Sequence, residues 1–168
     1  MSTTESFWNF SVNYYALPGK ADICLALQDG KGMDVNVLLF LLWQAQQRRR
    51  LSQAEIGEVV TFVESWRMSV VQPLRGVRRF LKEPGKPWET PGIRAFRERI
   101  KREELLAERI QQEAMAAAFP AVGQDGSVSS AARTNLALYA ELLKVALTDR
   151  ELTTLAEACN RRHDRFAR

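Results

Sequence analysis

The sequence contains few of the residues that most often carry catalysis or bind metals. Among its 168 residues are one histidine, His163, and two cysteines, Cys24 and Cys159, which do not form a CxxC pair. A glycine-rich phosphate loop and an HExxH motif are also missing from the sequence. Because His163 lies among arginines near the end of the chain, we expect water to surround it and assign it no role as a catalytic base. The sequence therefore predicts no catalytic residue and favours a protein that is not an enzyme.

Long apolar runs are missing as well. The most apolar segment, Gly30–Arg50, is interrupted by Asn36 and Gln44, whereas a membrane-spanning helix needs roughly 20 consecutive apolar residues. The first ten residues lack the basic region and apolar stretch of a signal peptide. Two scattered cysteines are typical of a reducing compartment, where disulfides are rare. The sequence therefore predicts a soluble cytoplasmic protein without membrane insertion.

The acidic residues near the N-terminus are too scattered to indicate a metal site. Asp22, Asp29 and Asp34 stand alone in the sequence. An isoprenoid synthase, which is also all-helical, needs clustered aspartates to hold magnesium and diphosphate. We therefore predict no metal and no cofactor.

Helical periodicity, in contrast, is present along most of the chain. Apolar residues recur every three or four positions, and no period-two alternation is long enough for a strand. The pairs Ser52–Glu55 and Thr148–Glu151 have the spacing of capping boxes, which begin helices. The predicted helices span residues 4–15, 19–29, 34–49, 52–82, 91–118, 129–147 and 149–161.

One of these helices is expected to lie at the centre of the fold. Segment 34–49 has no polar side chain between Val37 and Trp43, as expected for a helix that other helices surround. We therefore predict an all-α protein with a single domain, residues 1–168. In this domain a bundle of about six to seven helices packs around the apolar helix 34–49.

The long helix 52–82 has an irregular point near its middle. Its apolar spacing places Leu74 and Val77 on the side that faces the core. Pro73 lies beside them and is expected to kink the helix, because proline removes one backbone hydrogen bond.

Three segments are expected to lie outside helices. Residues 83–92, EPGKPWETPG, hold three prolines and two glycines, which predicts a stiff connecting loop. Residues 120–130 are polar and predict a flexible linker. Residues 162–168 are expected to form a frayed basic tail.

Two stretches of the chain resemble a known family. The segment from Phe7 to Trp43, FWNFSVNYYALPGKADICLALQDGKGMDVNVLLFLLW, is similar to the opening of a family of small bacterial proteins classed as a domain of unknown function. The segment from Trp66 to Lys82, WRMSVVQPLRGVRRFLK, is similar to the second recognisable stretch of that family. The resemblance implies an all-helical, cytoplasmic bacterial protein and brings no activity, cofactor or site.

Positive charge is concentrated in the middle of the chain. Fourteen cations and six anions between residues 45 and 102 give a net charge of +8, whereas residues 1–44 and 103–168 each carry −2. If loop 83–92 reverses the chain, the cations that end one helix and begin the next meet at one end of the bundle. The residues predicted to form this basic surface are Arg75, Arg78, Arg79, Lys82, Lys86, Trp88, Arg94, Arg97 and Lys101.

The sequence leaves open whether this basic surface is free. Cations in the first two turns of a helix oppose the helix dipole, so Arg94 and Arg97 need a negative group nearby. Glu89 or Glu98 could supply it within the chain, and so could an external anion. Because arginine offers forked donors to carboxylates and phosphates, we expect an intracellular binding or adaptor protein that contacts an acidic protein surface. Binding to the backbone of RNA or another nucleic acid is an alternative.

A further alternative is a small-molecule site or an unrecognised enzyme. Five of the fifteen aromatic residues lie in the first fifteen positions, so a pocket could form between the aromatic N-terminal helix and the central helix. Structural roles such as helix capping explain the same polar residues and are the favoured interpretation. The residues predicted to line this pocket are Trp8, Asn13, Tyr14, Asp22, Asp34 and Asn36.

Overall fold

The computed structural model describes residues 6–160. In this part of the chain, capping side chains and apolar spacing produce helices that turns and loops connect. The elements are α1 (Phe7–Tyr15), α2 (Lys20–Lys31), α3 (Val35–Gln46), α4 (Gln53–Trp66), the π-helical turn η1 (Arg67–Val71), α5 (Gln72–Phe80), α6 (Ile93–Ala118), α7 (Val128–Leu142) and α8 (Asp149–Asn160). Because α4, η1 and α5 follow one another without a break, the described residues contain seven helices and no strand. The predicted all-α, single-domain fold is confirmed.

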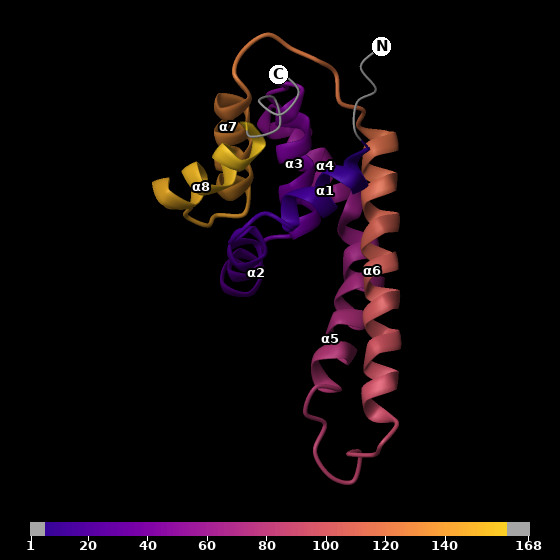
Figure 1. The fold of residues 1–168 in the computed structure, drawn as a ribbon. Coiled ribbons are helices and arrows are strands. Elements are labelled where there is room, and N and C mark those ends of the chain that lie inside the picture. The colour runs from indigo at the N-terminus through magenta and orange to yellow at the C-terminus, as the bar shows by residue number, and fades with distance from the viewer. Residues whose placement is uncertain (1–5, 161–168) are drawn as a thin grey trace, which may run out of the picture.

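The helices form a head and a long hairpin that projects from it (Figure 1). The head contains α1, α2, α3, α7 and α8, together with the start of α4 and the end of α6. The hairpin consists of the continuous helix α4–η1–α5 and of α6, which lies along it. With 26 residues, α6 is about 39 Å long, so its first half extends well beyond the head.

Helix α3 is the centre of the head, as predicted. Every residue from Val35 to Ala45 is buried, because α1, α2, α6, α7 and α8 all pack against this helix. The ring of Phe40 meets the edge of Phe7, with ring centres 5.5 Å apart, and it also contacts Phe119.

Side-chain caps fix where several helices begin. Ser52 and Glu55 satisfy each other's backbone donors at the start of α4, and Thr148 and Glu151 do the same at the start of α8. Asp34 accepts a hydrogen bond from the backbone of Asn36 at 2.8 Å and thereby caps α3. Both capping boxes predicted within the described residues are therefore confirmed.

Two helices end earlier than predicted. Helix α3 ends at Gln46 instead of residue 49, and α7 ends at Leu142 instead of residue 147. In each case a Schellman motif closes the helix on a residue with positive φ, which is Arg48 (59°) or Lys144 (56°). Glycine normally occupies this position, so neither helix end could be predicted from residue type. The other predicted bounds within residues 6–160 lie within two residues of the observed ones.

The predicted connecting segments have different structures. Residues 83–92 join α5 to α6 without helix, through turns in which Trp88 donates its backbone N–H to the carbonyl of Gly85 at 2.9 Å. Residues 120–127 are also non-helical, but 128–130 belong to α7. The predicted tail 162–168, which includes His163, lies outside the described residues.

The two cysteines belong to the interior of the head. Cys24 and Cys159 are both buried and free, and burial raises the pKa of each thiol to about 12. Both thiols are therefore protonated at neutral pH and behave as small apolar side chains. Among the described helices, none combines the length and the apolar character needed to cross a membrane.

Candidate functional site

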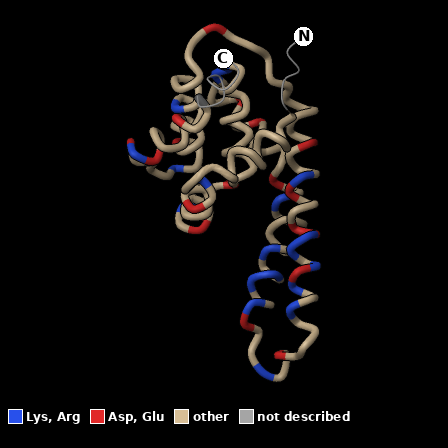
Figure 2. The backbone as a smooth tube through the Cα atoms, in the orientation of Figure 1, with Lys and Arg blue, Asp and Glu red and all other residues tan. Residues whose placement is uncertain are grey.

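The predicted basic residues all lie on the distal part of the hairpin. Figure 2 shows Lys and Arg side by side on α5 and on the first half of α6, with one more cation on the loop between them. Because α5 packs against α6, the loop reverses the chain as expected, and the two groups of cations meet at one end of the molecule. The residues differ, however, in whether the chain itself neutralises them.

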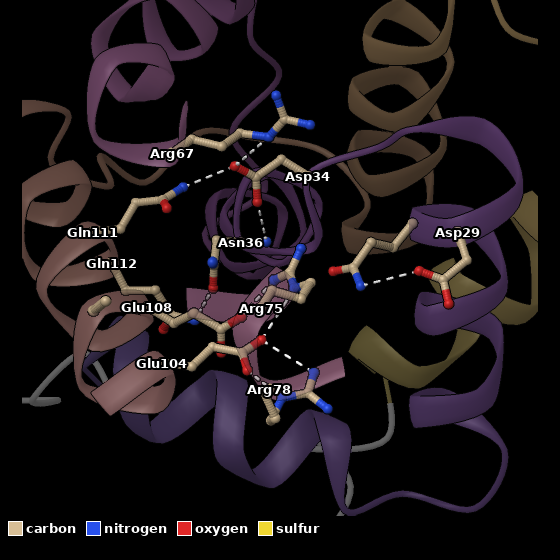
Figure 3. Close-up of polar contacts among 12 residues, drawn as sticks. Asp29, Asp34, Asn36, Arg67, Arg75, Arg78, Glu104, Glu108, Gln111 and Gln112 are labelled. Carbon is tan, nitrogen blue, oxygen red and sulfur yellow. Dashed lines mark hydrogen bonds and ion pairs between the residues drawn. The ribbon is translucent and has the colours of Figure 1, made fainter. Parts of the chain in front are cut away.

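Two of the predicted arginines are held by carboxylates of α6 (Figure 3). Arg75 is only 8% exposed, and it donates from Nε to Glu104 at 3.1 Å and from Nη2 to Glu108 at 2.8 Å. Arg78 binds the same Glu104 carboxylate with both Nε and Nη2. Arg75 and Arg78, which were predicted to contact a partner, instead form an internal ion-pair cluster between α5 and α6.

The two carboxylates of the cluster have opposite pKa shifts. Burial raises the pKa of Glu104, but hydrogen bonds from Arg78 and Arg75 outweigh burial and leave its pKa below the ordinary value. Burial also raises the pKa of Glu108, and its single contact with Arg75 offsets only part of that effect. Glu104 is thus the carboxylate that the cluster stabilises as an anion.

The π-helical turn explains why these arginines face α6. The backbone N–H of Gln72 donates to the carbonyl of Arg67, five residues earlier, so η1 holds one residue more than an α-helical turn. The extra residue rotates the following side chains by about 100° around the helix axis. As a result, Val77 is 42% exposed and Arg75 is buried, so the prediction that Val77 faces the core is wrong.

Pro73 gives a physical reason for this turn. In a regular α-helix the proline ring would collide with the carbonyl four residues earlier and leave that carbonyl without a donor. A wider turn before the proline relieves the contact, and the backbone has helical angles at Trp66, Arg67, Val71 and Gln72. Where a kink was predicted at Pro73, the structure has a π-helical turn just before the proline.

The remaining predicted cations lie at the surface. Arg79 pairs with Asp29 of α2 at 2.6 Å, and both side chains are about half exposed. Arg97 pairs with Glu98 at 3.3 Å, whereas its Nε is buried and has no hydrogen-bond acceptor among the described residues. Within residues 6–160, the other four predicted cations have no carboxylate within 4.0 Å. These four are Lys82, Lys86, Arg94 and Lys101, all of which are exposed.

Two exposed aromatic side chains accompany the unpaired cations. Phe80, at the end of α5, is 59% exposed, and Trp88, in the loop, is 62% exposed. We use the name hairpin tip surface for Phe80, Lys82, Lys86, Trp88, Arg94 and Lys101. Chemically, this surface offers positive charge and large apolar contact area in the same place.

The residues of the predicted alternative pocket do not surround one site. The hydroxyl of Tyr14 donates to the carbonyl of Leu155 at 3.0 Å, on the side of α1 that faces α8. Asp34 and Asn36 accept hydrogen bonds from Gln111 and Gln112 of α6, at 2.9 and 2.8 Å (Figure 3). These polar residues therefore join helices to one another.

The other three pocket residues lie elsewhere on the first two helices. Asn13 and Asp22 are exposed. Trp8 contacts the guanidinium of Arg109, 5.4 Å from the ring centre, beside a groove of about 430 Å³ between the start of α1 and the end of α6. The contact between α1 and α3 is instead filled by Phe7, which stacks on Trp43 at 5.4 Å.

Comparison with protein families identifies the chain's relatives. A family model described as a protein of unknown function, DUF2390, matches residues 6–115. The chain belongs to this family. The match includes α1 to α5 and most of α6, and therefore the whole basic hairpin. No curated protein and no solved structure matches the chain.

Sequence analysis missed the partners of the buried arginines. Glu104, Glu108 and Gln111 lie on the inward side of α6, at positions that follow Arg97 and Ile100 in steps of three and four. No polar residue of this helix was predicted to face inward. The available signal was charge: residues 94–102 of this helix are rich in arginine, and residues 103–113 contain four glutamates. Within the described residues, no three His, Cys, Asp or Glu side chains are grouped so that they could hold a metal ion.

Proposed function

We propose that this chain is a non-enzymatic, cytoplasmic binding or adaptor protein whose hairpin tip surface contacts an acidic surface on another protein. The observation that carries the proposal is a contrast along the hairpin. Near the head, Arg75 and Arg78 are neutralised by glutamates of the same chain. At the tip, Lys86 and Arg94 are exposed without such partners in the described chain, next to exposed Trp88.

The composition of the tip supports a protein partner. Tryptophan, other aromatic residues and arginine are enriched at protein interfaces, where an aromatic anchor fills a pocket and cations select complementary charge. Trp88 and Phe80 would supply such anchors, and Lys86 and Arg94 would favour a partner with carboxylates around its pocket.

The proposal can be tested by charge reversal at two sites. The intact protein is used to capture partners from cells that express it, and mass spectrometry identifies them. Affinity for the purified partner is then measured for Lys86→Glu with Arg94→Glu, which should weaken binding at least about tenfold. The matched control, Lys144→Glu with Arg150→Glu, changes two exposed cations of the head by the same amount and should leave the affinity unchanged.

A third variant separates apolar from electrostatic binding. Trp88→Ala should weaken binding by a similar factor at low and high salt, whereas the effect of the charge variant should shrink as salt rises. Equal affinities for the tip variant and the head control would refute the proposal. Captured material that nuclease removes would instead indicate nucleic-acid binding through phosphate contacts and base stacking on Trp88.

A further inference from the structure

Helix α6 has opposite charges in its two halves. Residues 93–105 contain five cations and three anions, and residues 106–118 contain two carboxylates and one arginine. The two halves therefore carry net charges of +2 and −1. This distribution is visible in Figure 2, where blue dominates the far end of α6 and red becomes more frequent toward the head.

One flank of the same helix is apolar and exposed. Phe96, Leu106 and Ile110 are 47%, 51% and 42% exposed, although side chains of this size are usually buried. Together with Arg99 and Glu103 they follow steps of three and four residues, so they share one side of the helix. The residue that follows each of these five, at positions 97, 100, 104, 107 and 111, lies on the inward side of α6. The flank therefore lies next to the contact between α6 and the helix α4–η1–α5. We call these five residues the α6 flank.

Two charged residues of the α6 flank have no partner in the described part of the chain. Arg99 and Glu103 are both exposed, and neither has an oppositely charged group of residues 6–160 within 4.0 Å. One turn further on, Arg109 and Glu113 form an exposed pair at 2.8 Å. Of these four residues, one cation and one anion therefore precede Leu106 in the sequence, Arg99 and Glu103, and one of each follows it, Arg109 and Glu113.

We infer that the α6 flank binds the same flank of a second copy of this chain in antiparallel orientation. Antiparallel pairing about Leu106 places the +2 half of one helix against the −1 half of the other, whereas parallel pairing places like charges together. A two-fold axis at Leu106 makes the contact self-complementary, because one patch then serves both copies. The two copies of Leu106 meet at this axis.

The same axis pairs the remaining charges. Arg99 of one copy lies opposite the second copy's Glu113, because both are seven residues from Leu106. Glu103 lies opposite the second copy's Arg109, because both are three residues away. Symmetry repeats each pair, so Arg109 and Glu113, which pair with each other within one chain, each also meet an opposite charge of the second copy around an apolar centre. The inference does not depend on the proposed function, because neither the apolar contacts nor the four charge pairs use a residue of the hairpin tip surface.

The structure offers a closely matched pair of variants for the test. Leu105 and Leu106 are neighbours on α6 and have almost the same exposure, 53% and 51%, but they lie on different sides of the helix. The mass of the full chain in solution is measured by light scattering and sedimentation over a range of concentrations. We expect a dimer for the native protein and for Leu105→Glu, and a dissociation constant at least about 100-fold larger for Leu106→Glu, since this change removes two apolar contacts in the dimer.

A charge swap tests the register. Arg99→Glu and Glu113→Arg should each weaken the dimer at least about fivefold, and the double variant should regain most of the native affinity. Circular dichroism of each variant confirms that the helices remain folded. The inference is overturned if the native chain has the mass of a single copy at every concentration. It is also overturned if Leu105→Glu and Leu106→Glu have equal effects, or if the double variant is weaker than both single ones.

Discussion

The head and the hairpin hold their helices together by different means. The buried cluster of the head is almost wholly apolar and draws on α1, α2, α3, α4, α7, α8 and the end of α6. Between α5 and the first half of α6 the buried side chains are instead Arg75 and Glu104, with Leu81 nearest the loop. Buried ion pairs define geometry well but give little net stability, because both charges must leave water. The hairpin is thus positioned by charge while the head supplies most of the folding energy.

Polar side chains connect the two regions. Asp34 caps α3 in the head and also accepts a hydrogen bond from Gln111 of the hairpin, and Arg67 of η1 lies 3.7 Å from the same carboxylate. Asn36 receives a hydrogen bond from Gln112 one residue further along α6. The capping group of the central helix therefore also fixes where the hairpin leaves the head.

The largest expected effect is in the head. Phe40→Ala should lower the free energy of unfolding by about 4 kcal/mol, because it leaves a cavity among Phe7, Trp43 and Phe119. Urea denaturation followed by circular dichroism measures the change. The matched substitution in the hairpin, Phe80→Ala, removes a ring that is 59% exposed and should change stability by less than about 0.5 kcal/mol. Similar losses in both variants would contradict the contrast between the two regions.

A smaller effect is expected from the ion-pair cluster. Glu104→Gln should cost about 3 kcal/mol, because it leaves Arg75 and Arg78 with too little negative charge in a buried site. Glu108→Gln should cost less than about 1 kcal/mol, since its amide oxygen can still accept from Arg75 and the cost of burying a charge disappears. Urea denaturation gives both values, and hydrogen exchange of α5 shows whether the loss is local. Equal costs for the two variants would contradict the roles assigned to the two carboxylates.

The smallest effect is the pH dependence of the same cluster. The pKa of Glu104 is lower in the folded protein than its ordinary value of 4.5, so its stabilising effect is complete above pH 4.5 and is lost as pH falls through the lowered pKa. The pKa of Glu108 is raised, so protonation of this group between its raised pKa and 4.5 favours the folded state. Denaturation of the native protein and both glutamine variants between pH 7 and pH 3 separates these contributions. The destabilisation by Glu104→Gln should shrink below pH 4.5, and a constant difference would refute the assignment.

The parts of this fold that follow from local chemistry were predictable from the sequence. The apolar run Val37–Trp43 identified the central helix, and capping boxes located the starts of α4 and α8. The ends at Arg48 and Lys144 were not predictable, because left-handed residues other than glycine leave no compositional mark.

The candidate site was predictable in place and only partly in its contacts. Loop 83–92 brought the cations of α5 and α6 to one end, as the charge distribution indicated. The pairing of Arg75 with Glu104 was not predictable from the sequence. Glu104 is 29 positions away, and Arg75 faces it only because η1 rotates the side chains of α5 about the helix axis.

The single extra residue in η1 affects everything beyond it. In helix α5, Arg75 and Arg78 contact glutamates of α6, whereas Val77 is exposed. The wide turn before α5 sets this orientation. The π-helical turn therefore rotates every side chain from Gln72 to the loop about the helix axis. This rotation determines which residues the far end of the hairpin exposes.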